Sequence, residues 1–206
     1  MEKPEQIATE DWYLHTRCWS RENDFDAEAS IDPDRTAVNC AHPWKITVRL
    51  GGERLTAGDH IAVELPVTWT ADMGRPYVYG RHLLSRNWTP GYAATPKLVF
   101  PEGVRADFEI TRDDHMSRYI ILDIVILEGA IGPGDQFQIF LARLEGTLIR
   151  CQWYAQNTPI PVAIRKRNEE RYRRLRRIPQ VMVTGGAPGM WKIVARLQAR
   201  SAAGSG

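Results

Sequence analysis

The residues best suited to chemistry or ligand binding gather in one stretch of the sequence, between Thr70 and Pro96. This stretch does not read as a strand, and three glycines within it supply bends. A loop of this length is uncommon in a compact domain unless it is functional or packs on itself. Aromatic rings beside arginine and histidine can form a platform for a sugar, a nucleobase or a partner's side chain. The candidate ligand-binding residues of this aromatic loop are Tyr77, Tyr79, Arg81, His82, Trp88 and Tyr92.

The aromatic loop admits several interpretations. We favour packing, with the rings folded inward as a lid over one end of the domain, because aromatic side chains are seldom left exposed. In a small stand-alone enzyme, the rings would instead line a pocket for an apolar or aromatic substrate. His82 would then be the catalytic residue that transfers a proton, since the unperturbed pKa of imidazole lies near neutrality. In a carbohydrate-binding module, Trp88 and a tyrosine would lie coplanar on an exposed surface.

No metal or cofactor site is predicted. The five histidines, at positions 15, 42, 60, 82 and 115, are scattered rather than spaced as ligands on one element. The run Asp113-Asp114-His115 fits a polar turn between two strands better than a ligand set. No Gly-x-Ser-x-Gly motif frames a nucleophile. Cys18, Cys40 and Cys151 include no Cys-x-x-Cys pair, so we expect reduced thiols.

A short phrase occurs twice, with Gly58-Asp59 in residues 55–63 and Gly134-Asp135 in residues 131–139. In each copy an aliphatic residue precedes the Gly-Asp pair, and alternating apolar residues follow it. Glycine takes positive φ without steric cost, and aspartate can bond nearby backbone N–H groups, so the pair suits a tight turn into a strand. Neither aspartate lies in a cluster of oxygen donors of the kind that binds calcium. We therefore interpret both aspartates as structural.

The charges are unevenly distributed, although the net charge is only +2. Residues 165–177 hold eight lysines or arginines against two glutamates, whereas residues 2–34 are acidic. The simplest interpretation is that the two stretches attract each other within the fold. Nucleic-acid binding is disfavoured, because Tyr172 alone is interleaved with the arginines. An acidic protein partner remains a candidate, and its binding residues would be Arg165, Arg167, Arg171, Arg173, Arg174 and Arg177.

These residues must be positioned by an all-β fold. A chain of 206 residues with 43% hydrophobic and 25% charged residues is typical of a globular protein with a sizeable core. Short β-type runs recur at near-regular spacing, separated by Gly, Pro and Asp, which predicts an immunoglobulin-like antiparallel β-sandwich. The expected strands span residues 46–50, 60–65, 97–100, 106–111, 119–127, 136–141, 147–154, 160–164, 180–183 and 191–195.

One stretch could be helical. Residues 165–177 are rich in good helix formers, and Tyr172, Leu175 and Ile178 would give a narrow apolar stripe while the arginines face water. A long charged hairpin is the competing shape.

We expect residues 1–44 to be an N-terminal extension packed on the sandwich, residues 45–196 to be the sandwich, and residues 197–206 to be a flexible tail.

Several fold-marking residues resemble a known group of proteins. They include Leu55-x-x-Gly58-Asp59, Leu65-Pro66-x-x-Trp69, Pro90-Gly91-Tyr92, Gly132-Pro133-Gly134-Asp135 and Val183-x-Gly185-Gly186-x-Pro188. In these positions the chain resembles the N-terminal β-sandwich region of large bacterial proteins of a domain-of-unknown-function family. The later part of those proteins resembles PHP-type metal-dependent phosphoesterases. The resemblance covers roughly residues 45 to 196 and includes no metal ligand.

The resemblance implies a non-catalytic accessory or partner-binding sandwich, a subunit or module of a larger enzymatic assembly. This chain ends in a Gly-Ser tail where the family continues into its metal-binding domain, so we expect no hydrolase active site here. Its basic segment is longer than the family would suggest, which leaves room for a specialised contact. We expect a protein partner or catalytic subunit, leave a small-molecule ligand open, and expect no membrane partner. The N-terminus lacks the apolar core of a secretion signal, which predicts a cytoplasmic location.

Overall fold

The computed structural model describes residues 19–66, 68–72, 95–112, 119–142 and 148–185, and every regular element in these ranges is a strand. The long strands are β1 (Trp19–Asp32), β4 (Lys45–Leu50), β6 (His60–Pro66), β9 (Arg105–Arg112), β10 (Tyr119–Glu128), β12 (Gln136–Phe140), β16 (Tyr172–Arg177) and β17 (Gln180–Thr184). The short ones are β2 (Arg35–Ala37), β3 (Ala41–His42), β5 (Leu55–Thr56), β7 (Thr70–Asp72), β8 (Lys97–Val99), β11 (Ala130–Ile131), β13 (Leu148–Arg150), β14 (Gln156–Pro159) and β15 (Val162–Arg165).

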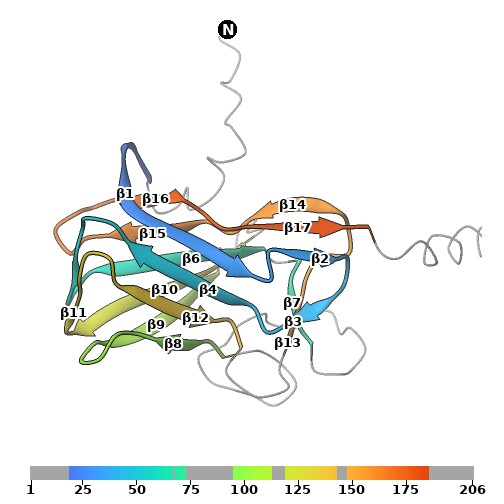
Figure 1. Cartoon of the computed structure of the whole chain (residues 1–206), viewed down its shortest axis with the longest axis horizontal. Helices are drawn as coiled ribbons and strands as arrows, with labels where there is room; N and C mark the ends of the chain where they lie inside the picture. The colour runs from blue at the N-terminus through green and yellow to red at the C-terminus, as the bar shows by residue number, and fades with distance from the viewer. Residues whose placement is uncertain (1–18, 67, 73–94, 113–118, 143–147, 186–206) are drawn as a thin grey trace, which may run out of the picture.

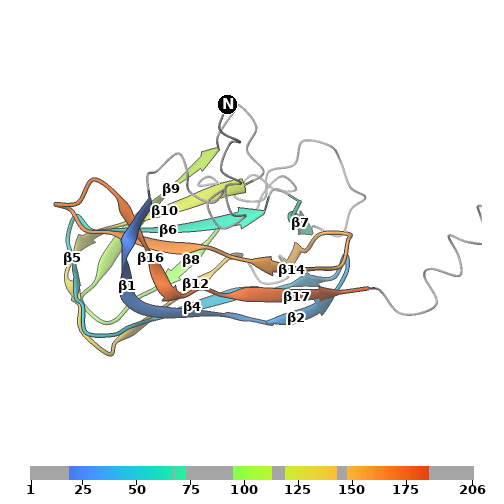
Figure 2. The same cartoon turned by 90° about the horizontal axis from the view of Figure 1, so that it is seen from above.

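Nine strands form one sheet in the order β8-β12-β4-β1-β16-β15-β6-β10-β9. The sheet bends, so that β4, β1 and β12 make one layer and β6, β10 and β9 make the other (Figures 1 and 2). Most neighbours pair antiparallel, whereas β1 with β16 and β17 with β2 are parallel. The predicted all-β sandwich is therefore confirmed.

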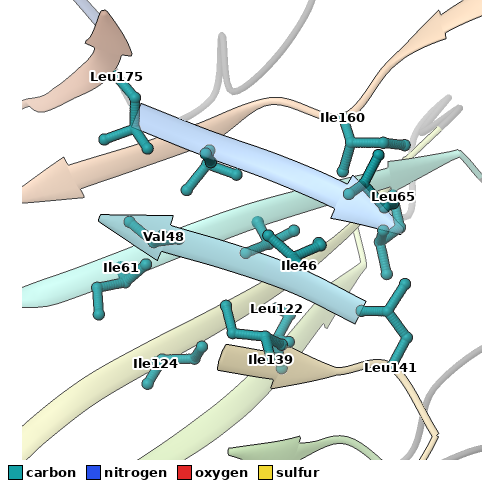
Figure 3. Packing of buried hydrophobic residues seen from close by; sticks show 14 of the residues in the cluster. Ile46, Val48, Ile61, Leu65, Leu122, Ile124, Ile139, Leu141, Ile160 and Leu175 are labelled. Atoms are coloured by element: carbon teal, nitrogen blue, oxygen red, sulfur yellow. The ribbon is translucent and has the colours of Figure 1, made fainter. Parts of the chain in front are cut away.

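The core lies between the two layers and is made of alternate residues of each strand. In β4 the buried residues are Ile46, Val48 and Leu50, and the residues between them are partly or fully exposed. Figure 3 shows such side chains from β4 and β12 facing those from β6 and β10. Burying each large apolar side chain contributes roughly 1.5–3 kcal/mol, so this alternation fixes which face of each strand points inward.

β1 corrects the expected domain boundary. We expected residues 1–44 to pack on the sandwich as an extension, but β1 lies in the middle of the nine-stranded sheet, between β4 and β16. Its side chains alternate, with Phe25, Ala27, Ala29 and Ile31 buried. The sandwich therefore begins no later than Trp19, and its predicted end at residue 196 lies outside the described residues.

The basic segment is a hairpin, so the helical interpretation is wrong and the competing shape is confirmed. β15 pairs antiparallel with β16, and residues 166–171 turn between them. Tyr172 and Leu175 are three residues apart and therefore lie on opposite faces of the strand. Leu175 belongs to the main core, whereas Tyr172 joins a separate buried cluster with Ala62, Ile121 and Ala163. Burial on two faces outweighs helix propensity here.

The repeated Gly-Asp turns lie side by side. β5, which precedes Gly58, pairs antiparallel with β11, which precedes Gly134. Both glycines have positive φ, at 88° and 80°, as the turn requires. In each turn the aspartate accepts a hydrogen bond from the backbone N–H three residues earlier, at 2.7 Å in one copy and 2.9 Å in the other. The structural interpretation of Asp59 and Asp135 is therefore confirmed.

Two small three-stranded sheets close one end of the sandwich, in the orders β3-β13-β7 and β14-β17-β2. The predicted strands between residues 46 and 183 all coincide with observed ones, although only Leu148–Arg150 of the expected strand 147–154 is extended. The expected strand at residues 191–195 lies outside the described residues. The candidate site described below lies at this end of the molecule, on the loop between β13 and β14.

Candidate functional site

The candidate ligand-binding residues of the aromatic loop, namely Tyr77, Tyr79, Arg81, His82, Trp88 and Tyr92, lie outside the described residues. His15, the run Asp113-Asp114-His115 and Cys18 lie outside them as well. The pocket near His82 and the lid therefore stay predictions. The remaining candidates, above all the arginines, are described.

Three arginines of the basic hairpin form ion pairs within the fold. Arg173 and Arg174 form ion pairs with Glu53 and Asp24, with the nearest atoms 2.7 and 2.9 Å apart. Arg176 also pairs with Asp26, at 2.9 Å. The expected attraction between the acidic opening and the basic run is confirmed. Of the proposed partner-binding residues, Arg167, Arg171 and Arg177 are exposed, and Arg165 lies over the Tyr172 ring.

Arg173 is the most buried of the three arginines in these ion pairs, with its side chain 16% exposed. Its guanidinium makes two hydrogen bonds to the Glu53 carboxylate, at 3.0 and 2.7 Å, and stacks 4.7 Å from the centre of the Phe25 ring. Burial alone would raise the pKa of Glu53, but the bonds from Arg173 and from the Asp26 N–H hold that pKa below its usual value. Arg173 thus joins three segments of chain and is not available as a partner-binding residue.

Asp59 forms a further internal ion pair. Its carboxylate is fully buried and accepts hydrogen bonds from the Lys166 ammonium at 2.5 Å and the Arg167 N–H at 2.9 Å. Burial raises the pKa of Asp59, but these bonds and the one from the Thr56 N–H outweigh it, so the pKa lies below its usual value. The ion pair fastens the turn of the basic hairpin to the first Gly-Asp turn.

A third polar group lies on the outer face of β6, β10 and β16. Asp123 accepts hydrogen bonds from the Tyr172 hydroxyl, at 3.0 and 3.1 Å, and its Oδ1 lies 3.3 Å from His60 Nδ1. Small residues, Ala62 and Ala163, lie beside the tyrosine in the same buried cluster. The carboxylate therefore orients Tyr172 on this face.

A buried polar network supports the end of the sandwich. The Trp69 indole N–H donates to Gln152 Oε1 at 2.6 Å, and Gln152 Nε2 donates to the Thr158 hydroxyl at 2.5 Å. The Trp44 ring lies 4.5 Å from the Trp69 ring, and its N–H donates to the Ile149 carbonyl at 2.6 Å. Each of these three N–H donors has a buried acceptor, so the network holds Trp44, Trp69 and Gln152 in place at this end of the sandwich.

One contact at this end has the geometry of an activated nucleophile. Thr36 Oγ1 lies 2.6 Å from His42 Nε2, which is the distance expected between a hydroxyl and its general base. The His42 ring packs edge-on against Trp44, and within the described part of the chain no carboxylate bonds to it. The hydroxyl is buried. We interpret the pair as structural.

Trp153 and Tyr154 are the exposed feature of this end. The Trp153 side chain is 76% exposed, the largest fraction among the large hydrophobic residues described, and Tyr154 is 37% exposed. Their rings meet edge to face, with centres 5.7 Å apart. Both follow directly after Gln152, which is 1% exposed and held by the buried network. We call Trp153 and Tyr154 the aromatic tip.

The sequence reasoning missed the aromatic tip because residues 147–154 were read as one strand. A signal was present. Two adjacent aromatic residues cannot both face inward on a strand, and the polar residues Gln156, Asn157 and Thr158 that follow break the alternation. This pattern therefore predicts that one of the two rings is exposed to solvent.

Within the described ranges, no group of three His, Cys, Asp or Glu side chains could hold a metal ion. Those ranges also contain no helix long and apolar enough to cross a bilayer. What this end offers chemically is contact by exposed rings.

No family model matches the chain, and no curated protein matches it. Among solved structures, the one described as "The unique CBM3- of Hungateiclostridium clariflavum" aligns with 79% of this chain and 99% of that chain. The sequence identity is 13% and the TM-score is 0.31. The function of this chain is therefore inferred from its own residues.

Proposed function

We propose that this chain is a non-catalytic binding sandwich, an accessory or partner-binding module of a larger enzymatic assembly. The observation that carries the proposal is the aromatic tip, an exposed tryptophan and tyrosine on a rigidly anchored loop. Tryptophan and tyrosine are enriched among the residues that dominate binding energy at protein interfaces. A tryptophan left 76% exposed forgoes the burial that this side chain usually finds within its own domain.

The buried network beneath the aromatic tip favours binding over chemistry. Gln152 is bonded on both sides by Trp69 and Thr158, so the chain leaves the core at a fixed point. A preorganised contact residue loses little conformational entropy when a partner arrives. The described carboxylates Asp59 and Glu53 are instead committed to internal ion pairs, which leaves them no part in catalysis.

The proposed partner is a protein surface with an apolar recess for the Trp153 ring. Arg177, the last residue of β16, is exposed and would add a contact if the partner is acidic, whereas the turn that carries Arg167 and Arg171 lies at the end of the sandwich away from β14 (Figures 1 and 2). The resemblance to the sandwich region of larger phosphoesterase-like proteins agrees with a catalytic chain as the partner. We further propose that the isolated chain has no phosphoesterase activity, and robust turnover with added Mn²⁺ or Zn²⁺ would overturn the assignment.

Affinity capture from the native cell tests the proposal, with the wild-type chain and Trp153→Ala as paired baits. The protein enriched by the wild type alone is then purified and titrated against both. We expect Trp153→Ala to weaken the complex by roughly 30-fold or more, as for a central interface residue. Leu127→Ala is the matched control, since Leu127 is an exposed apolar residue of β10 with 41% exposure. Equal binding by wild type and Trp153→Ala would contradict the proposal.

A carbohydrate is the second candidate ligand, because an exposed tryptophan ring can stack on a sugar face. The side-chain amides of Asn157 and Gln180 are hydrogen-bonded to each other at 2.7 Å on the exposed side of β14 and β17. The perpendicular rings of the aromatic tip offer one stacking surface rather than a flat platform. A glycan array probed with wild type and Trp153→Ala distinguishes the two candidate ligands. If neither protein binds any glycan, the protein partner is the remaining candidate.

A further inference from the structure

Cys40 and Cys151 face each other across the pair formed by β3 and β13. The register of that pair sets Ile149 opposite His42 and Arg150 opposite Ala41. One more step in the same register brings Cys151 opposite Cys40. The backbone agrees, because the Cys151 N–H donates to the Cys40 carbonyl at 3.0 Å.

The sulfur of Cys151 lies against the turn that carries Cys40. Cys151 is 3% exposed, and its Sγ lies 3.3 Å from the Ala37 carbonyl oxygen. The Cys40 N–H donates to that same oxygen at 3.3 Å. Asn39, between them, has a φ of 60°, so the backbone turns back on itself at this point. Cys151 Sγ and the Cys40 N–H therefore share one acceptor, the Ala37 carbonyl oxygen.

The spacing of the two residues suits a disulfide. Residues directly opposite in an antiparallel pair have their Cα atoms about 4.5 to 5.5 Å apart. Disulfides join Cα atoms about 4.4 to 6.8 Å apart. Both thiols are free in this structure, so both are available to form the bridge.

We propose that Cys40 and Cys151 form a reversible disulfide that fastens the loop of the aromatic tip to the turn between β2 and β3. The inference stands on the two cysteines alone and does not need the proposed function. Cys151 immediately precedes Gln152, where that loop leaves the core. Oxidation would therefore restrain the loop at the point where it leaves the core.

The two thiols have different roles in the reaction. Cys40 is partly exposed, so its thiolate can attack a small disulfide such as oxidised glutathione, forming a mixed disulfide and releasing one glutathione thiol. The thiolate of Cys151 then attacks Cys40 Sγ and displaces the second glutathione. Two protein thiols are oxidised, glutathione disulfide is reduced to two thiols, and the proton lost from each cysteine ends on a glutathione.

The environment of Cys151 agrees with this order. Burial raises the pKa of its thiol above the usual value, although the backbone N–H groups of Cys40 and Asn39 act in the opposite direction. The buried thiol is thus a poor entry point and reacts only when a mixed disulfide forms beside it.

The test is to incubate the folded chain with a large excess of oxidised glutathione, quench by alkylation, and map disulfide-linked peptides by mass spectrometry. We expect a Cys40–Cys151 bridge and a melting temperature raised by about 5 to 15 °C, since a long loop is closed. Cys18→Ser should give the same bridge. Cys40→Ser should leave Cys151 reduced and remove the rise.

Three results would overturn the proposal. The first is that both thiols stay reduced in the folded chain, and the second is that Cys40 stops at the glutathione adduct. The third is a bridge that involves Cys18 instead. Because oxidation is performed on the wild-type chain, none of these results depends on whether a variant folds. Trp153→Ala should form the bridge as the wild type does, which keeps this test independent of the binding function.

Discussion

Asp59 and Asp135 occupy the same place in two copies of one short phrase, yet their surroundings differ. Both accept a hydrogen bond from the backbone three residues earlier, and both follow a glycine with positive φ. Asp59 alone is fully buried, with the Lys166 ammonium as its counter-charge. The turn is thus a shared local device, and the buried ion pair is added to one copy of it.

Substitution of these two aspartates should separate the turn from the ion pair. Asp59→Asn keeps the shape but removes the negative charge, which leaves the Lys166 ammonium largely buried without its counter-charge. We expect a loss of about 2–3 kcal/mol in the free energy of unfolding. Asp135→Asn is the control, and it should cost about 0.5 kcal/mol or less, because Asp135 is exposed. Urea unfolding of the variants measures both, and equal costs would contradict the ion-pair argument.

The buried carboxylate also predicts how stability depends on pH. The folded pKa of Asp59 lies below its usual value, so its contribution is fully present above the unfolded pKa of about 4. That contribution is lost as pH falls through the folded pKa. We expect the free-energy difference between wild type and Asp59→Asn to be constant from pH 7 to about 5 and to shrink below pH 4. Urea titrations at each pH measure it, and a difference that grows in acid would contradict this assignment.

At this scale the sequence predicts what is local and misses what is distant. The Gly-Asp turns could be predicted because a glycine and an aspartate carry the geometry within a few residues. Lys166, the partner of Asp59, is 107 residues away, and nothing in its own neighbourhood indicates that contact. The aromatic tip was missed for a different reason, because a short apolar run reads as a strand wherever it lies.

At the scale of elements, the basic hairpin is built around Arg173. Most of its neighbours in sequence are charged, so propensity favours a helix, but the strand lets Leu175 reach the core while Arg173 lies over Phe25. The guanidinium can do this because its apolar face stacks on the ring while its N–H groups bond Glu53. The arginine is therefore a packing residue as much as a charge.

Replacing Arg173 by lysine should show which of its two roles matters. Lysine keeps the charge but loses the paired hydrogen bonds and the stacking, so we expect a loss of about 1–2 kcal/mol in the free energy of unfolding. Arg171→Lys is the matched control on the same hairpin, and its effect should stay within about 0.5 kcal/mol, because Arg171 is exposed. Denaturant unfolding in low and high salt measures both. A cost for Arg173→Lys no larger than that for Arg171→Lys would mean that the charge of Arg173 alone matters.

The strands that could be predicted are those whose apolar residues alternate clearly, such as β4, β6 and β12. β1 was missed although Phe25, Ala27, Ala29 and Ile31 do alternate. Two of its four inward residues are alanines and its outward residues are mostly acidic, which makes the strand resemble a solvated extension. For β16 the sequence left a helix and a hairpin open, because a strand buried on two faces by single residues has no period of its own.

At the scale of the whole molecule, the two halves of the described chain are joined in one sheet. β1 lies between β4, which is close in sequence, and β16, which is about 150 residues away. The ion pairs from Asp24 to Arg174 and from Asp26 to Arg176 also join β1 to β16. Removing the first strand would therefore open the middle of the sheet rather than trim its edge.

A chain that begins at Lys45 tests this arrangement. It keeps the sandwich as first expected from the sequence but lacks β1, so β4 and β16 lose their common neighbour. We expect no cooperative urea transition and no native near-ultraviolet circular dichroism. Addition of a synthetic peptide of residues 19–44 should restore both, because the missing strand can pair from outside. Cooperative unfolding of the shortened chain alone would show that residues 19–44 are a dispensable extension.

The parallel pairing of β1 with β16 has a consequence for synthesis on the ribosome. At about 5 to 20 residues per second, roughly 7 to 30 seconds pass between the emergence of the two strands. β4 can cover one side of β1 early, but the other side stays open until Tyr172–Arg177 has been made. During that interval Asp24, Asp26 and Glu28 line the waiting strand, and like charges on neighbouring nascent chains oppose pairing between copies. The acidic residues that later bind arginines would first act as a safeguard against aggregation.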